Sequence, residues 1–293
     1  MAAKKEHYTI SLLNVYRLTT QVIVSEPKLW APFFLLMLLE LGAVILAYVA
    51  PREPFIQFFG PPISTFFGEI FLHYPAHLLL VPLLAVMARY AITVLIGPLL
   101  LGTAVSMLGQ SYKGRKVYFW RSLKTSFFRY IQIFFIISLI FISAYFVTHQ
   151  LRLFLRGYFA AGHEQLFIFG QAWWWGPFMT AANFAIALIA QALLIYSIPM
   201  VLIDNVKLFP ALVQAIAFFL RRMAKTLFMI ALPMLLYLPV MILLLNAPTI
   251  VNRFIPDAVF GICIAAALLN WLLVELLTIV SLTFAYLEVK YRR

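Results

Sequence analysis

Long apolar segments recur along this chain and are separated by short polar connections. Six of them approach or exceed the roughly 20 mostly apolar residues that a helix needs to cross a bilayer. They cover residues 30–50, 78–107, 130–148, 180–203, 226–245 and 259–286. The second and sixth are longer than a bilayer requires, which predicts tilt or an extension into the interface. The pattern predicts an all-α, polytopic membrane protein with six transmembrane helices.

Prolines inside these segments predict kinks, because proline removes a backbone hydrogen bond within a helix. They are Pro82, Pro98, Pro199, Pro233 and Pro239. Composition agrees with a membrane protein, since 65% of the residues are hydrophobic and only 11% are charged. Soluble proteins are roughly half apolar and a quarter charged. The single cysteine, Cys263, excludes an intramolecular disulfide. The N-terminal segment lacks an apolar stretch of signal-peptide length, so no cleaved signal is expected.

Basic residues are distributed unevenly between the two sides of the predicted membrane domain. Of the 22 Lys and Arg residues, 17 lie in the N-terminal segment, the tail, and the second-to-third and fourth-to-fifth connections. The opposite side holds Arg52, Arg152, Arg156 and Arg253. By the positive-inside rule, both termini are predicted to be cytoplasmic, in a bacterial inner membrane. The net charge of +12 therefore indicates that the protein interacts with anionic lipid rather than with nucleic acid.

Each of the three basic connections contains a stretch with helical periodicity just before an odd-numbered spanning segment. In the second, Arg121, Lys124 and Arg129 oppose Phe119, Leu123 and Phe127. Such a pattern is typical of a helix in the plane of the interface. An ordinary solvated connecting helix is the alternative. Seven residues are candidates for contacts with lipid headgroups: Arg17, Arg121, Lys124, Arg129, Arg221, Arg222 and Lys225.

The three amphipathic stretches end at Lys28, Arg129 and Lys225, at nearly equal intervals. This spacing indicates a three-fold pseudo-repeat of helical hairpins within one transmembrane domain, over about 8–108, 109–204 and 205–293. Each unit would consist of an interfacial helix, an outgoing helix and a returning helix. Parallel repeats of this kind are related by an axis along the membrane normal.

Two segments resemble a known family. GRKVYFWRSLKTSFFRYIQIF (114–134) and IPMVLIDNVKLFPALVQAIAFFLRRMAKTLFMI (198–230) are similar to the paired signatures of the YciC-like, glycerophosphodiester phosphodiesterase membrane-domain-like proteins. The distinct points are Gly114, Pro199, Asp204, Asn205 and Ala211. The resemblance implies a six-helix bacterial membrane protein. Some relatives carry a fused phosphodiesterase domain, which this sequence lacks, so that activity is not implied. A looser similarity of residues 204–207 to CysZ-like sulfate permeases leaves transport open.

Common catalytic motifs are absent from the sequence. It contains no phosphate-binding glycine loop, no nucleophile elbow and no zinc-protease helix, so a non-enzymatic protein without cofactors is predicted. Glu69, His73 and His77 are spaced by four and could offer metal ligands on one helical face, although Pro75 interrupts it. Histidines at headgroup level that bind nothing are the alternative.

Aromatic and proline-rich segments are predicted on the outer side. A tryptophan run at 173–175 is expected to anchor the interface rather than to stack on a sugar or lipid headgroup. The proline-rich segment 51–62 is expected to be an outer loop that dips toward lipid, with substrate gating as the alternative.

Four polar residues lie inside the predicted spans: Glu40, Arg89, Gln191 and Glu275. A charge at the bilayer centre costs at least about 2.5 to 3.5 kcal/mol, so these residues should face protein or water. Arg89 is expected to pair with Glu40 or Glu275. Gln191 precedes Pro199 much as Arg89 precedes Pro98, which predicts a shared polar layer among the returning helices. An ion pair that only locks the bundle and a substrate or proton site both remain open.

Two non-enzymatic functions fit these features. One is a scaffold, assembly or accessory subunit that packs with membrane lipids, other membrane proteins or copies of itself. The other is a small transporter or lipid-handling protein with a polar site around Arg89, Glu40 and Glu275. An intramembrane enzyme would be a third class, but this sequence contains no recognisable nucleophile or metal motif. The positions of the intramembrane polar residues distinguish the scaffold from the transporter, because in a transporter these residues should line one cavity.

Overall fold

The computed structural model describes residues 12–160, 171–253 and 255–291, with backbone alone at 12–13, 155–160 and 171–177. Helices account for almost all of this part of the chain, and it contains no strand. Lys4, Lys5, His163, Arg292 and Arg293 lie outside the described residues, as do the side chains of Arg156 and of the tryptophans at 173–175.

Six apolar helical segments in the described residues are long enough to cross a membrane, which confirms the predicted fold class. The first joins a short turn, η1 (Pro27–Leu29), to α2 (Trp30–Val49), and the second joins η3 (Ala76–Leu79) to α4 (Leu80–Leu95). The third lies in α7 (Tyr130–Ala160), and the fourth comprises α8 (Gln171–Leu194) and α9 (Ser197–Ile203). The fifth is α11 (Met223–Leu245). The sixth comprises α13 (Ala258–Leu269), the π-helical turn η5 (Asn270–Glu275) and α14 (Leu276–Tyr291).

Two of the three returning helices are interrupted beside a proline, whereas the third runs through the π-helical turn η5 without a break. The second span ends at Leu95, and α5 (Gly97–Tyr112) begins a new helix, with Pro98 in its first turn. In the fourth, α8 ends at Leu194 and α9 begins at Ser197, two residues before Pro199. Proline is tolerated in a first turn because the N–H it lacks would have no partner there. The long second segment predicted from the sequence is therefore two helices.

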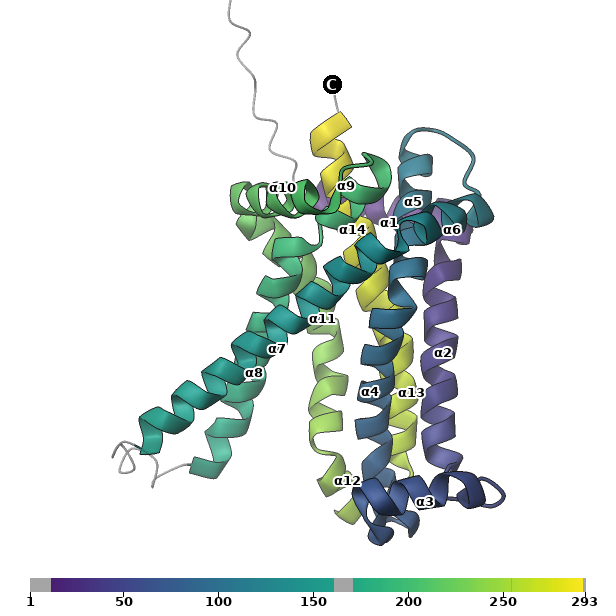
Figure 1. Cartoon of the computed structure of the whole chain (residues 1–293), viewed down its shortest axis with the longest axis vertical. Helices are drawn as coiled ribbons and strands as arrows, with labels where there is room; N and C mark the ends of the chain where they lie inside the picture. The colour runs from purple at the N-terminus through teal and green to yellow at the C-terminus, as the bar shows by residue number, and fades with distance from the viewer. Residues whose placement is uncertain (1–11, 161–170, 254, 292–293) are drawn as a thin grey trace, which may run out of the picture.

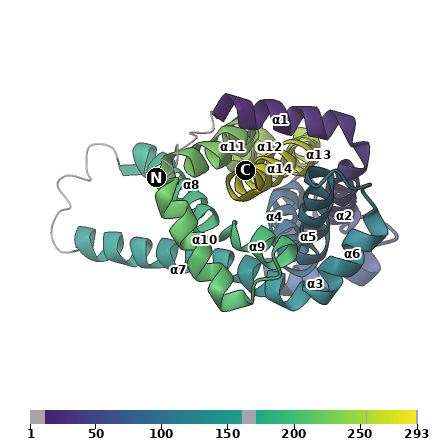
Figure 2. The ribbon, with the colours of Figure 1, turned by 90° about the horizontal axis from the view of Figure 1, so that it is seen from above.

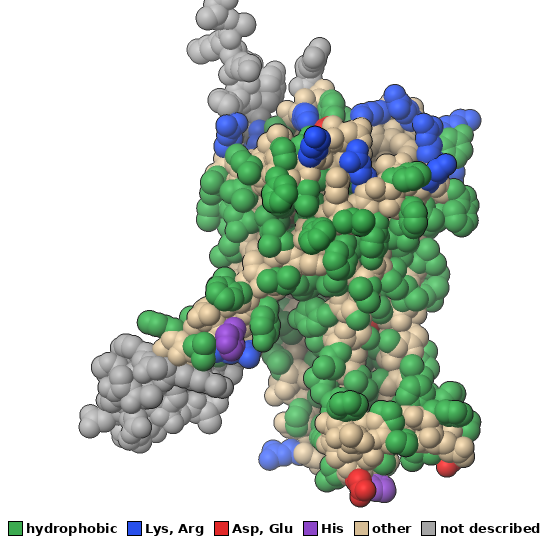
Figure 3. Space-filling model, viewed as in Figure 1, with side chains coloured by type: hydrophobic (Ala, Val, Ile, Leu, Met, Phe, Trp, Pro, Cys, Tyr) green, Lys and Arg blue, Asp and Glu red, His purple; other side chains and the backbone are tan. Residues whose placement is uncertain are grey.

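The predicted amphipathic helices are α1 (Leu12–Ser25), α6 (Phe119–Phe128) and α10 (Leu208–Arg221), and all three lie at one end of the molecule (Figure 1). Viewed from above, they are arranged around α5, α9 and α14 (Figure 2). Lys and Arg side chains gather at this end, which we call the basic end, while acidic and histidine side chains appear at the opposite end (Figure 3). The order of amphipathic, outgoing and returning helix occurs three times along the chain. The rotational symmetry of these units stays a prediction.

The face of α6 that is buried against the rest of the protein carries small residues, whereas α10 buries Ala211, Ala215 and the large Phe219. In α6 the buried side chains are Ser122 and Ser126, while Phe127 is exposed. Small residues are needed there because α5 approaches closely: a Cβ added to Gly102 would lie 3.0 Å from Ser126 Oγ and 2.8 Å from Ile133 Cδ1. The large apolar side chains of these helices instead point outward, at Trp120, Phe127 and Phe128 of α6 and at Phe209, Val213, Ile216 and Leu220 of α10.

The opposite end contains a helix where a loop was predicted. Residues 56–67 form α3 (Ile56–Phe67), which includes Pro61 and Pro62 and buries Gly60 and Ile63. It lies across the ends of the spanning helices (Figure 1). Residues 51–55 do form turns, but the prediction was wrong for residues 56–62, because their prolines were taken as signs of a loop. Asp257, before α13, accepts a hydrogen bond from Tyr48 Oη at 2.9 Å and links α2 to α13 at this end.

The α7–α8 hairpin diverges from the other spanning helices. It contacts α5, α9 and α10 near the basic end and leans away from α4 and α13 toward the opposite end (Figure 1). The surface is hollowed between the hairpin and the rest of the protein (Figure 3). This divergence leaves space inside the membrane-spanning region.

Candidate intramembrane binding site

A cavity of about 550 Å³ lies between the hairpin and the other helices. Its walls come from α4, α5, α7, α8, α9, α11, η5 and α14. Ligand pockets typically measure about 300 to 1,000 Å³ and combine an apolar lining with a few polar groups. The volume and the lining therefore both match a small-molecule site.

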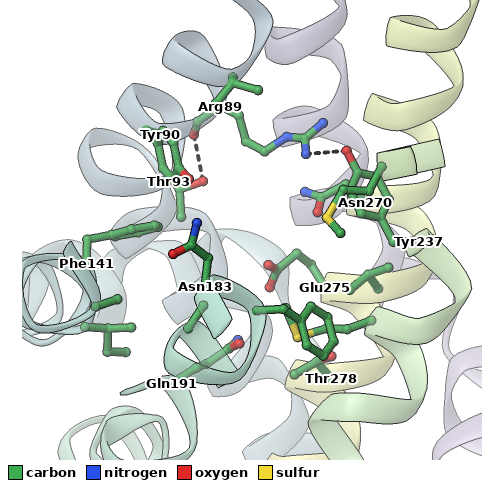
Figure 4. A pocket seen from close by; sticks show the side chains of 18 of the residues that line it. Arg89, Tyr90, Thr93, Phe141, Asn183, Gln191, Tyr237, Asn270, Glu275 and Thr278 are labelled. Carbon is green, nitrogen blue, oxygen red and sulfur yellow. Dashed lines mark hydrogen bonds between the residues drawn. The ribbon is translucent and has the colours of Figure 1, made fainter. Parts of the chain in front are cut away.

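Arg89 of α4 lies at the wall of this cavity in a network of four side chains. Its Nε and Nη2 donate to Glu40 Oε1 at 2.9 and 2.7 Å. Its Nη1 donates to Tyr237 Oη at 2.7 Å (Figure 4). The other carboxylate oxygen of Glu40 accepts a hydrogen bond from Trp271 Nε1 at 2.6 Å. Glu40 and Trp271 are fully buried. This network ties α2, α4, α11 and η5 together and satisfies both charges inside the span.

The π-helical turn η5 presents two polar side chains to the cavity, Asn270 and Glu275. One extra residue in the turn brings positions five apart onto one face, and such turns are frequent at functional sites. Glu275 points into the cavity (Figure 4). Among the described residues, none forms an ion pair or a hydrogen bond with its carboxylate.

Two amides on α8, Asn183 and Gln191, face Glu275 across the cavity (Figure 4). Asn183 Oδ1 and Thr278 Oγ1 are buried and have no hydrogen-bond partner in the described part of the chain. Buried polar atoms are normally paired, so unpaired ones need an explanation such as a bound ligand. Both residues line the cavity, but these two oxygen atoms are themselves shielded from it.

Apolar and aromatic side chains form the remainder of the lining. Tyr90 of α4 meets Phe141 of α7 edge to face, with ring centroids 5.4 Å apart. Val86, Ile140 and Leu238 are among the aliphatic residues. The site thus offers polar groups beside a larger apolar volume, which suits an amphipathic molecule.

The sequence correctly predicts part of this arrangement. The pairing of Arg89 with Glu40 is confirmed, and Arg89, Gln191 and Glu275 line one cavity, as the shared polar layer requires. Glu275 does not pair with Arg89. Sequence reasoning missed Tyr237, Trp271, Asn183 and Asn270. The two asparagines could have been found as amides within apolar segments, whereas nothing in the sequence distinguishes Tyr237 from other tyrosines.

The seven headgroup candidates all lie on or beside the amphipathic helices of the basic end. Arg17, Arg121, Lys124 and Arg221 are exposed, while Arg129, Arg222 and Lys225 are partly buried. Arg129 Nη2 donates to Asn205 Oδ1 at 3.3 Å, so this residue also connects α6 to the turn after α9. The seven basic groups thus lie at one end of the molecule (Figure 3).

The metal-ligand candidates do not share one helical face. Glu69 lies in the short turn η2 (Glu69–Leu72), His73 follows it, and His77 lies in η3 beyond a turn at Pro75. Pro75 thus interrupts the helical face, as its position in the sequence indicates. Within the described residues, no group of three or more His, Cys, Asp or Glu side chains could hold a metal ion.

A second polar cluster surrounds Asp204 at the basic end. Its carboxylate accepts hydrogen bonds from Tyr286, Lys290 and Tyr291 of α14. Burial alone would raise the pKa of the Asp204 carboxyl, but these hydrogen bonds and the positive charge of Lys290 hold its pKa below the ordinary value. Asp204 therefore fixes the turn after α9 to α14.

The fold and the cavity together define a multi-pass membrane protein with a partly polar cavity among its spanning helices. No protein-family model, curated protein or solved structure matches this chain. The resemblance to YciC-like proteins therefore stays a prediction carried by the two quoted segments.

Proposed function

We propose that the protein is a non-enzymatic, small transporter or lipid-handling protein that holds an amphipathic molecule in the cavity between the α7–α8 hairpin and the other helices. The observation that carries this proposal is the convergence of Arg89, Gln191, Glu275, Asn183 and Asn270 on one cavity. Polar groups inside a membrane are costly and mark substrate or ion pathways when they face a cavity. A scaffold would have no need to gather them.

The divergence of the hairpin supports entry from the side. Because α7 and α8 lean away from α4, the cavity lies beside the hollowed surface (Figure 3). In a bilayer this surface would face lipid tails, so an amphipathic molecule could enter without crossing water. This route suits a lipid-like ligand better than a small inorganic ion.

The basic end is proposed to face the cytoplasm and to bind anionic lipid. The concentration of basic side chains and the outward apolar residues of α6 and α10 support an interfacial position for these helices. Cysteines introduced at exposed Lys116 and Glu69 test the orientation with a membrane-impermeant maleimide in intact cells. We expect the Glu69 position to be labelled and the Lys116 position to be protected. The reverse pattern would contradict the orientation.

A scaffold, assembly or accessory role is the second candidate. It is favoured by the hairpin, whose side chains at Ile142, Tyr145 and Phe146 are exposed, so that lipid, another membrane protein or a second copy could pack there. This role predicts stoichiometric protein partners after mild detergent extraction. It does not require a small molecule in the cavity.

Cavity-filling variants separate the two functions. Ala187 lines the cavity, whereas Ala185 lies on the exposed side of the same helix, so A187F and A185F form a matched pair. Organic extracts of the purified proteins would be compared by mass spectrometry. We expect a small amphipathic molecule to co-purify with the parent protein and with A185F, but not with A187F. Extracts that do not differ would count against the proposed function.

A further inference from the structure

The charges around the cavity do not balance. Among the described residues that line it, Arg89 and Glu275 are the charged ones. Arg89 is already neutralised by Glu40, with Nη2 and Oε1 2.7 Å apart, and its Nη1 is occupied by Tyr237 Oη. Glu275 is left without an ionic partner in the described part of the chain. The cavity therefore carries one uncompensated acidic group.

This imbalance selects the charge of a ligand. A carboxylate inside a membrane is costly unless an opposite charge accompanies it. A ligand with a positively charged group would supply that charge, whereas an anionic ligand would meet repulsion from Glu275 and find the Arg89 guanidinium already engaged. We propose that the cavity binds amphipathic organic cations, such as long-chain amines or quaternary ammonium and phosphonium compounds, with Glu275 as their counter-charge.

The neighbours of Glu275 fit the cationic group and its apolar substituents. The amides of Gln191 and Asn270, which line the same cavity, carry oxygens that can accept hydrogen bonds from an ammonium. The rings of Tyr90 and Phe141, on the opposite wall, offer π faces that attract cations. A volume of about 550 Å³ far exceeds that of a single metal ion, so the remaining apolar space requires a hydrophobic body on the ligand.

This inference rests on the proposed function, because it names the ligand class of the same cavity. Two probes of the same shape and opposite charge test it: tetraphenylphosphonium and tetraphenylborate. Binding would be measured by equilibrium dialysis on the full chain in a neutral detergent, with empty micelles subtracted. The variants are E275Q, which removes the charge but keeps the size, E69Q as an exposed acidic control, and the pair A187F and A185F. Thermal unfolding of each variant verifies that it is folded.

We expect tetraphenylphosphonium to bind the parent protein, E69Q and A185F with similar affinity, and E275Q and A187F at least tenfold more weakly. Tetraphenylborate should bind poorly to all of them. The assigned ligand charge is wrong if A187F abolishes binding of tetraphenylborate, or if E275Q binds tetraphenylphosphonium as well as the parent does. In both cases the cavity remains a ligand site. If neither probe binds, or if A187F and A185F bind alike, the inference is overturned. Identical organic extracts from A187F and A185F would then overturn the proposed function as well.

Discussion

Replacing Arg89 with leucine should destabilise the protein by stranding Glu40. The substitution removes two hydrogen bonds to Glu40 and one to Tyr237, and leaves a fully buried carboxylate whose remaining donor among the described residues is Trp271. Removing one partner of a buried ion pair typically costs about 3 to 5 kcal/mol. Since 1 kcal/mol shifts Tm by roughly 2 to 4 °C in domains of somewhat smaller size, we expect Tm to fall by on the order of 10 °C. Thermal unfolding in detergent measures this shift.

A second variant isolates the charge from the packing. In R89L/E40Q the buried charge is gone, and the glutamine oxygen can still accept the hydrogen bond from Trp271. We expect this double variant to recover more than half of the lost stability. R253L, at an exposed residue of α12 (Ala247–Arg253), is the control and should change stability by about 0.5 kcal/mol or less. A double variant as unstable as R89L would refute the reasoning, because the loss would then come from packing rather than from an unpaired carboxylate.

Three further outcomes are expected. The first concerns a variant in which Arg121, Lys124 and Arg129 are all replaced by glutamine. It should retain less anionic lipid in native mass spectrometry, because each basic group near the surface contributes about 1 kcal/mol. Equal retention by this variant and by R253Q would contradict the interfacial position. Because the pKa of Asp204 is lowered on folding, its contribution to stability is complete above the ordinary pKa and is lost as the pH falls through the folded value. D204N should therefore lower Tm at neutral pH, and its difference from the parent should narrow below about pH 4; a difference that stays constant down to acid pH would contradict this. G102V should cost about 1 to 3 kcal/mol by crowding Ile133 and Ser126, whereas G261A, where a Cβ meets nothing within 4 Å, should be neutral or stabilising in thermal unfolding.

The membrane-spanning fold could be predicted because its signal is local. Continuous apolar runs specify spanning helices without reference to tertiary contacts, and the prolines at 98 and 199 mark where two returning helices are interrupted. The same local reasoning failed for α3, whose prolines are typical of a loop, although Ile63 packs with Ala50 and Leu80 of neighbouring helices. Local patterns also do not specify the inner face of α6, because the need for serine there arises from the close approach of α5, which is a tertiary property.

The candidate site was predictable only in its charged part. The cost of a charge in lipid requires Arg89 to find an acidic partner, but two acids satisfied that requirement equally in the sequence. The choice of Glu40 follows from how α2 and α4 pack, and it is this choice that leaves Glu275 in the cavity without a partner among the described residues. Tyr237 and Asn183 enter the site through the positions of α11 and α8, which no local pattern specifies.

The position of α14 has a consequence for the order of assembly. This helix is buried along nearly its whole length, from Leu276 to Leu287, and α1, α5 and α11 pack against it. Yet it follows all of these helices in the chain, and chains are synthesised from the N-terminus. Earlier helices can enter the membrane one by one during translation, but the basic end cannot acquire its central packing partner until α14 has emerged. Tertiary assembly of that end is therefore a late event, completed only after the other spans have been synthesised.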